Sequence, residues 1–332
     1  MIRLVQLKHF DGGRAVARVS GKELHFIESV SSVYELAQQA LRSGQALAKL
    51  AQDMATGWAM PYDAIYNGDS EWKLLPPFDH PAEPARCSIT GTGLTHKASV
   101  DNRNAMHAAQ VQVTDSMRMY QWGLEGGKPA ADEIGASPEW FYKGNGTILR
   151  AHGEPLEIPD FAEDGGEESE IAGVYLVDPS GLPRRVGMAQ GNEFSDHIFE
   201  KKNYLYLASS KLRQCSLGPE LILDPEFESV PGKARIHRGT AVLWEKDIRS
   251  GESAMCHSLQ NMEHHHFKFP LHRRGGDVHI HFFGASAFSF GDQIQLREGD
   301  VMEVNYQGFG RPLKNPVKVI GGPAKLAQVS PL

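Results

Sequence analysis

Two kinds of hydrophobic spacing follow one another in the first part of the chain. Residues 1–27 place short hydrophobic runs on either side of the turn signal Asp11-Gly12-Gly13, which predicts a β region. In residues 31–54 hydrophobic positions recur at helical spacing, which predicts a helix that Gly44 can interrupt. The Pro-rich stretch at residues 74–81 then predicts a linker.

Beyond the linker, short β-rich runs separated by Gly, Pro and Asp dominate the pattern. We expect one helix over residues 102–122 and an acidic loop over residues 161–168. The expected strands are residues 171–177, 205–208, 241–244, 279–283 and 301–306. The chain is therefore predicted to be an α+β, β-rich protein with a small N-terminal α+β domain at residues 1–75 and a larger domain at residues 76–332.

The composition narrows the classes of protein to which the chain can belong. Its 332 residues are 41% hydrophobic and 23% charged, so it can bury a core without disulfides. The net charge of −7 argues against nucleic acid as a partner, because phosphate binding needs clustered Lys and Arg. The three cysteines are well separated, and the sequence shows neither a signal peptide nor a membrane-length hydrophobic run. We therefore expect a cytoplasmic protein without a membrane partner.

Glu168, Ser169 and Glu170 lead directly into the strand expected at residues 171–177. Residues two apart in a strand point to the same side, and neighbouring carboxylates repel each other unless a cation lies between them. Hard oxygen ligands of this kind suit Mg²⁺, with Mn²⁺ and Ca²⁺ as alternatives. An isolated pair at this spacing is more often a solvated acidic loop, so the pattern alone does not establish a metal site.

A third carboxylate and a lysine follow at residues 191–197 (GNEFSDH) and 208–211 (ASSK). Together with the E-x-E strand, these stretches resemble the fumarylacetoacetate hydrolase superfamily, which carries an N-D-V-S-x-R-like turn and a K-S-x-D stretch ending in G-P. The family's third metal ligand aligns with Glu193, and Asp196 is the alternative. The family's arginine is His197 here, so the role of that arginine does not carry over.

Three further stretches extend the resemblance over most of the larger domain. Residues 138–143 (PEWFYK) resemble the family's P-x-x-F-x-K, residues 296–304 (LREGDVMEV) resemble its L-x-x-G-D-x-x-E-x, and residues 308–317 resemble its closing G-x-G-x-L-x-N-x-V. The resemblance implies the family's catalytic β-roll fold and a homodimer. It also implies a Mg²⁺ site formed by Glu168, Glu170 and Glu193.

The chemistry of three carboxylates agrees with this resemblance. Mg²⁺ on such a site keeps positions for substrate, and a 2-keto acid can chelate it through carboxylate and keto oxygens. Polarising the ketone makes a proton at C3 acidic or a C3–C4 bond breakable. Lys211 and Lys143 lie within family-like motifs and are catalytic candidates that would stabilise negative charge on the substrate.

The stretch that follows Gly93 bears on the type of reaction. The hydrolase branch carries G-L-N-Y-x-x-H, whose histidine activates water. Here G-L-T is followed by His96, a catalytic candidate, with His107 as another nearby histidine. Arg103, on the expected helix, can hold a substrate carboxylate bidentately. Thr95 and Ser286 are the other substrate-binding candidates. In the family that the chain resembles, a threonine stands at the position of Ala285, in the turn Gly284-Ala285-Ser286, and Ser286 can supply that hydroxyl.

This stretch and the N-terminal domain look more like the GguC-like branch that dehydrates 2-keto-3-deoxy sugar acids. The implied reaction converts 2-keto-3-deoxypentonate to 2-oxoglutarate semialdehyde in sugar catabolism. Two alternatives share the metal site: a C–C hydrolase of an acylpyruvate or diketo acid, which would need His96, and an oxaloacetate-type decarboxylase. A different class is a zinc-binding protein, suggested by the histidines between His264 and His281. We interpret those histidines as polar lining or an interface.

Overall fold

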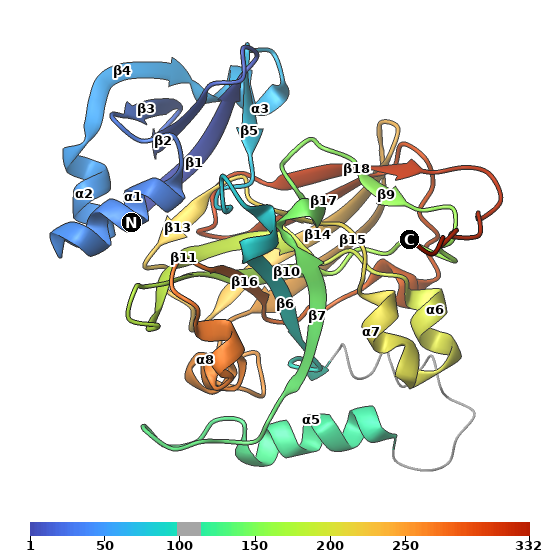
Figure 1. The fold of residues 1–332 in the computed structure, drawn as a ribbon. Helices are drawn as coiled ribbons and strands as arrows, with labels where there is room; N and C mark the ends of the chain where they lie inside the picture. Colours follow the sequence, from blue (N-terminus) through green and yellow to red (C-terminus); the bar gives the residue numbers. More distant parts are fainter. Residues whose placement is uncertain (98–113) are drawn as a thin grey trace.

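The computed structural model describes residues 1–97 and 114–332 and contains two β-sheets (Figure 1). The larger sheet follows the order β4-β3-β2-β1-β13-β11-β10-β16-β6-β7, with β5 paired to β1 and β12 joining β11 to β8. Its strands are β1 (Ile2–His9), β2 (Arg14–Ser20), β3 (Glu23–Ile27), β4 (Ala55–Pro61), β5 (Trp72–Leu75), β6 (Cys87–Gly93), β7 (Glu139–Asn145), β8 (Leu149–Arg150), β10 (Ser169–Val177), β11 (Pro183–Asn192), β12 (Cys215–Leu217), β13 (Leu221–Leu223) and β16 (Val278–Phe282).

The smaller sheet follows the order β15-β14-β17-β18-β9. Its strands are β9 (Leu156–Ile158), β14 (Val230–Arg238), β15 (Ala241–Ser250), β17 (Val301–Tyr306) and β18 (Leu313–Val319). In Figure 1 it lies at the opposite end of the molecule from α1 and α2. The strand-rich, mixed α/β fold that the sequence predicted is confirmed.

Short helices cover the sheets. They are α1 (Val33–Ser43), α2 (Leu47–Asp53), α3 (Tyr62–Asn67), α5 (Asp115–Gly126), α6 (His197–Lys202), α7 (Leu207–Ser210) and α8 (Leu259–Phe267), with 3₁₀ turns at Pro84–Arg86, Gly146–Ile148, Tyr204–Tyr206, Pro270–Arg273 and Ser289–Asp292. The helix expected over residues 31–54 is interrupted at Gly44, whose φ of 68° ends α1. No helix in the described part of the chain is long and apolar enough to cross a membrane.

Two expected elements differ from the structure. Residues 205–208 were expected to form a strand, but they lie in the Tyr204–Tyr206 turn and α7. The side chain of Asn203 accepts a hydrogen bond from the amide of Leu205 and starts this helical turn, while Leu205 itself is 82% exposed. The helix expected over residues 102–122 is found from Asp115, after the N-cap Thr114; the earlier part of that prediction lies outside the described residues.

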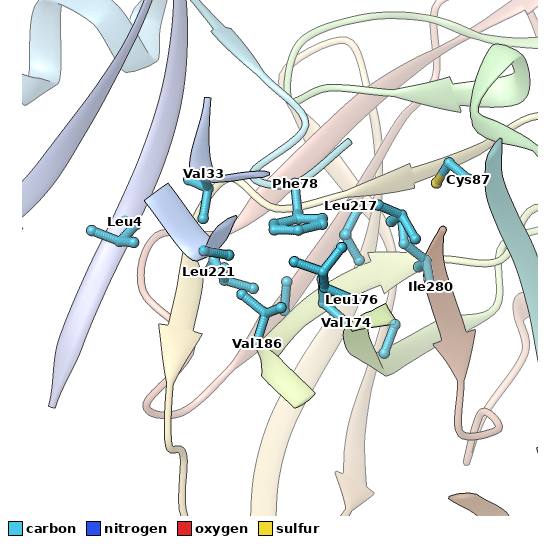
Figure 2. Packing of buried hydrophobic residues seen from close by; sticks show 14 of the residues in the cluster. Leu4, Val33, Phe78, Cys87, Val174, Leu176, Val186, Leu217, Leu221 and Ile280 are labelled. Carbon is cyan, nitrogen blue, oxygen red and sulfur yellow. The ribbon is translucent and has the colours of Figure 1, made fainter. Parts of the chain in front are cut away.

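The N-terminal strands share a sheet and a core with the rest of the molecule. β1 pairs with β13 from Ile2↔Leu223 to Leu4↔Leu221. Leu4 and Val33 belong to the same hydrophobic cluster as Leu221, Val174 and Phe78, and Figure 2 labels these side chains. Phe78 lies in the stretch expected to be a linker, so that stretch also fills the core. The division into domains at residues 1–75 and 76–332 stays a prediction.

Candidate metal centre

The three glutamates predicted to bind metal come together at one end of the β10–β11 pair. Glu170 lies in β10, Glu168 precedes it, and Glu193 follows β11. The ladder pairs Glu170 with Gly191, and the amide of Glu193 donates to the carbonyl of Glu168 at 2.9 Å. One carboxylate oxygen from each glutamate lies within 4.8 Å of the others, and all three side chains are buried.

Two buried lysines hold the carboxylates of Glu168 and Glu193 in place. Lys211 Nζ lies 2.5 Å from Glu168 Oε1 and 2.6 Å from Glu193 Oε2, so it bridges the two. Lys143 Nζ lies 2.5 Å from Glu193 Oε1 and also donates to the carbonyl oxygen of Phe194. Buried charges of opposite sign must pair because isolated ones are costly away from water. Both lysines predicted to be catalytic therefore contact the carboxylate cluster.

The surroundings shift the pKa values of Glu170 and Glu168 in opposite directions. Burial raises the pKa of Glu170 well above its ordinary value, and the charges of Glu193 and Glu168 raise it further. Burial opposes ionisation of Glu168 too, but Lys211 and a hydrogen bond from His197 hold its pKa below the ordinary value. His197 Nε2 lies 3.0 Å from Glu168 Oε1. His197, at the position where the sequence resemblance places an arginine, thus contacts a predicted ligand.

The cluster fits a hard divalent cation. When all three carboxylates are ionised, they carry one more negative charge than the two contacting lysines offset. A cation between them would reduce their repulsion, and protonation of one carboxylate is the alternative. Each carboxylate oxygen has two lone pairs, so it can accept from a lysine or amide and still bind an ion. Among the described residues, this is the single group of three His, Cys, Asp or Glu side chains with ligand atoms so close together.

Asp196, the alternative ligand, is occupied elsewhere. Its carboxylate caps α6 by accepting from the amide of Phe199 at 2.9 Å, accepts from the amide of Glu163, and forms an ion pair with Arg213 at 3.0 Å. These bonds give Asp196 a structural task at the start of α6. The geometry therefore favours Glu193 over Asp196 as the third ligand.

Thr95 and His96 follow a strained turn after β6. Leu94 has a φ of 53°, which is rare for a residue other than glycine. Thr95 Oγ1 donates to the carbonyl oxygen of Phe283 at 2.8 Å and lies 2.8 Å from His96 Nδ1. The next amide, that of Gly284, donates to Glu170 Oε2 at 2.7 Å. Hydrogen bonds to residues 283–284 thus link Thr95 and His96 to the glutamate cluster.

The hydrogen bonds of Thr95 fix the tautomer of His96. Because the hydroxyl proton of Thr95 goes to the carbonyl of Phe283, its oxygen accepts from His96 Nδ1–H. The lone pair of the neutral ring is then on Nε2, as a proton acceptor requires. Burial lowers the pKa of His96 to about 4, so the ring is neutral near pH 7.

The other two substrate-binding candidates are not brought to the cluster by any described contact. Ser286 Oγ accepts from the amide of Arg249 at 3.0 Å, which ties it to β15. Arg103 lies outside the described residues, as does His107. Their predicted roles stay predictions.

Glu139 is a candidate that the sequence analysis missed. It lies on β7 two and four residues before Phe141 and Lys143, and all three side chains are buried while Trp140 and Tyr142 are exposed. A Cβ atom on the facing Gly93 would lie 1.9 Å from Glu139 Oε1, so this glycine makes room for the carboxylate. Tyr204 donates to Glu139 Oε2 at 3.1 Å. Alternation along the P-E-W-F-Y-K motif was the signal that would have identified it.

The histidines suggested as a zinc site pack between α8 and β16. His266 Nε2 lies 3.0 Å from His279 Nδ1, and Thr90 and Thr92 each lie 2.7 Å from a ring nitrogen of His281. Within the described residues they form no group of three ligand atoms at metal-binding spacing. These contacts fit the polar-lining interpretation.

Comparisons with known proteins identify the fold. No family model matches the chain, and no curated protein matches it. Two solved structures, "2-keto-3-deoxy-D-arabinonate dehydratase apo form" and the same enzyme "complexed with magnesium and 2,5-dioxopentanoate", are each 18% identical to it, with TM-scores of 0.71 and 0.70. Both cover 96% of this chain, which covers 100% and 99% of theirs.

A third solved structure has a different activity in its description. It is a 2-hydroxyhepta-2,4-diene-1,7-dioate isomerase from Mycobacterium marinum, 16% identical, with a TM-score of 0.59 over 97% of this chain and 100% of its own. The predicted fumarylacetoacetate hydrolase-type fold is thereby confirmed. Identities this low show the fold alone.

Proposed function

We propose that this protein is a Mg²⁺-dependent dehydratase that converts a 2-keto-3-deoxypentonate to 2-oxoglutarate semialdehyde. The observation that carries the proposal is the buried cluster of Glu168, Glu170 and Glu193. Lys143 and Lys211 contact this cluster, and Glu139 lies on the same buried face of β7 as Lys143. A homodimer that acts on a 2-keto acid in sugar catabolism is part of the same proposal.

The three glutamates would hold the metal. Mg²⁺ would supply Lewis-acid polarisation of the substrate's 2-keto group, which acidifies the C3 protons. Lys211 and Lys143 balance most of the charge of the buried glutamates. They also place positive charge beside the position where negative charge develops when C3 loses a proton.

The reaction needs proton transfer at two ends of the substrate. Loss of the C3 proton and the C4 hydroxyl leaves a C3–C4 double bond. One hydrogen then leaves C5 and one leaves its hydroxyl, while one is added at C3 and one at C4. The product of this isomerisation is the aldehyde. Glu139 and Lys143 lie on the same buried face of β7, and Lys143 is the one that contacts the glutamate cluster. We assign Glu139 to the C4–C5 end and His96, which is linked to Glu170 through Thr95 and residues 283–284, to C3.

The comparisons support the substrate class. One structure with this fold is described as a 2-keto-3-deoxy-D-arabinonate dehydratase bound to magnesium and 2,5-dioxopentanoate. That compound is 2-oxoglutarate semialdehyde under another name. It is therefore the product expected from the proposed reaction.

The test is incubation of the purified protein with 2-keto-3-deoxy-D-arabinonate and with its enantiomer, which differs at C4, with and without Mg²⁺. We expect 2-oxoglutarate semialdehyde, no pyruvate, and loss of turnover with EDTA that Mg²⁺ or Mn²⁺ restores. Pyruvate from an acylpyruvate, with no turnover of either pentonate, would replace the proposal by the C–C hydrolase. Full activity in a verified metal-free sample would refute the metal requirement.

A variant separates Glu139 from the metal centre. Glu139→Gln should lower kcat by about 10²-fold or more, the usual loss when an acid–base group is removed, while the affinity for Mg²⁺ stays unchanged. Glu133→Gln, an exposed carboxylate shortly before β7, is the matched control and should keep full activity. Equal kcat values for the two variants would remove Glu139 from the mechanism.

A further inference from the structure

Phe141 lies between the two groups that the proposed reaction places at opposite ends of the substrate. Glu139, Phe141 and Lys143 alternate along β7 and point to the same buried face, so the phenyl ring belongs to the middle side chain of the three. Lys143 contacts the glutamate cluster through Glu193, and Glu139 is assigned to C4 and C5. A substrate that spans the two ends therefore passes Phe141 near C3.

Two glycines of β6 leave room for this row of side chains. Gly93 pairs with Glu139 in the ladder, and Gly91 pairs with Phe141. A Cβ atom on Gly91 would lie 2.3 Å from Phe141 Cζ, so the tip of the ring lies over the backbone of the neighbouring strand. A larger residue at position 91 would displace the ring. The sequence of β6 thus determines where the ring lies in the site.

A cation lies over the Phe141 ring. Lys211 Nζ is 4.9 Å from the ring centroid, and the same ammonium group bridges Glu168 and Glu193. An ammonium group is attracted to the face of an aromatic ring by the electrons above the ring plane. The ring therefore adjoins the carboxylates that would bind the metal, and it forms an apolar part of the same site.

The ammonium groups next to the ring already have acceptors. Lys143 Nζ contacts Glu193 Oε1 and two backbone carbonyl oxygens, and these three acceptors match the three protons of the group. Lys211 directs two protons to two of the clustered carboxylates. Neither lysine is thus arranged to donate to a substrate hydroxyl beside Phe141. A hydroxyl placed against the ring would lose its water without gaining a hydrogen bond from these groups.

We propose that Phe141 makes the site selective for 2-keto acids whose C3 carries no hydroxyl group. The inference rests on the proposed function, because it uses the assignment of Glu139 to C4 and C5. A C3 methylene packs against the ring, whereas a C3 hydroxyl is desolvated there. Apolar pockets reject an added hydroxyl by up to about 10²-fold, so we expect a preference of about 10-fold to 10²-fold. The ring thereby selects substrates at the carbon that loses the proton.

The test compares the dissociation constants of 2-oxobutanoate and 3-hydroxypyruvate in calorimetric titrations of the Mg²⁺-loaded protein. The two acids have equal size and differ in carrying a methyl or a hydroxyl group on C3, and neither has a C4 hydroxyl that could leave. We expect the wild type to bind 2-oxobutanoate about tenfold or more tightly than 3-hydroxypyruvate. Equal affinities would overturn the proposal.

Two substitutions of Phe141 and one control assign the preference to the ring. Phe141→Asn should abolish the preference, because an amide can form a hydrogen bond with a C3 hydroxyl, while Phe141→Leu keeps an apolar surface and should retain most of it. Tyr142→Asn, on the exposed face of β7, is the matched control and should bind both acids like the wild type. Loss of the preference in Phe141→Leu, or its full retention in a folded Phe141→Asn, would contradict the assignment.

The binding experiment and the turnover assay have separate outcomes. Equal affinities in a protein that converts 2-keto-3-deoxy-D-arabinonate would overturn the selectivity and leave the dehydratase. The expected preference in a protein that converts neither pentonate would overturn the dehydratase and leave the selectivity. Failure to bind either acid would overturn the selectivity, and the turnover assay would still decide on the dehydratase.

Discussion

Glu168 and Glu170 lie two residues apart, yet they have opposite electrostatic surroundings. Glu168 accepts from Lys211 and His197, so its negative charge is compensated without a metal. Glu170 accepts from one neutral amide, that of Gly284, and faces the other two carboxylates. Of the two, Glu170 is therefore the carboxylate whose surroundings favour protonation, and a metal held there would need it in the deprotonated form.

The first prediction follows from this asymmetry. Glu170→Gln resembles the protonated side chain, so the melting temperature of the metal-free protein should not fall. Because Mg²⁺ stabilises only a folded chain that binds it, the rise in melting temperature on adding Mg²⁺ should be lost. Glu167→Gln, a buried carboxylate that accepts from Ser289 rather than joining the cluster, is the control and should keep that rise. A Mg²⁺-induced rise in Glu170→Gln equal to that of the wild type would refute the assignment.

Glu193 and Asp196 can be separated in the same way. Glu193→Ala should abolish detectable Mg²⁺ binding in a calorimetric titration. Asp196→Ala should keep Mg²⁺ binding but lower the free energy of unfolding by about 1–3 kcal/mol or more, since it removes a helix cap and leaves Arg213 buried without its partner. The reverse order of Mg²⁺ affinities would make Asp196 the ligand.

At the scale of secondary-structure elements, local patterns predicted some of the site and long-range pairing determined the rest. The E-x-E pair could be found because both glutamates lie in one short run of the sequence. Glu193 was predicted from the family resemblance alone, and the direct pairing of β10 with β11 explains why it lies beside them. Glu139 could not be placed by this reasoning, because its neighbour across the sheet is Gly93, 46 residues earlier, and its hydrogen bond comes from Tyr204. The hydrophobic run at residues 205–208 was misread because a single side-chain cap from Asn203 turns it into a helix.

The packing of β16 against α8 predicts a pH dependence. Burial, together with neighbouring histidines, lowers the pKa of His279 to about 4 and that of His281 to about 3. Below a pH of about 6.5 the unfolded chain binds protons that these folded histidines do not, so stability is complete above that pH and falls as the pH drops toward 4. Each such histidine adds up to about 1.4 kcal/mol per pH unit to this slope.

Urea unfolding between pH 7 and pH 4.5 measures this effect. The free energy of unfolding of the wild type should fall with decreasing pH, and His281→Gln should show a shallower fall because one proton-binding difference is gone. His281→Gln can retain a hydrogen bond to Thr90 or Thr92, which limits its cost at pH 7. Parallel curves for the two proteins would show that His281 is not titrated on unfolding.

At the scale of the whole molecule, the N-terminal strands complete the larger sheet. Removing residues 1–75 would uncover the edge of β13 and take Leu4 and Val33 out of a shared core. We expect the fragment of residues 76–332 to aggregate or to lack a cooperative thermal transition, because an exposed edge and an opened hydrophobic cluster favour association. Size-exclusion chromatography and a melting curve test this. A monodisperse, cooperatively melting fragment would instead establish residues 76–332 as an independent domain.

The arrangement of the glutamate cluster also bears on the order in which the chain folds. Its three glutamates lie in or next to β10 and β11, which are neighbours in the sequence, but Lys143 of β7 contacts Glu193 and the amide of Gly284, after β16, donates to Glu170. The complete site therefore exists only after strands far apart in the sequence have paired. Contacts at such separations form slowly, because closing long loops costs entropy before the pairing compensates for it. During refolding, Mg²⁺ binding should therefore return later than far-ultraviolet circular dichroism. The ion would then act as a reporter of the final step of assembly rather than as a nucleus for it.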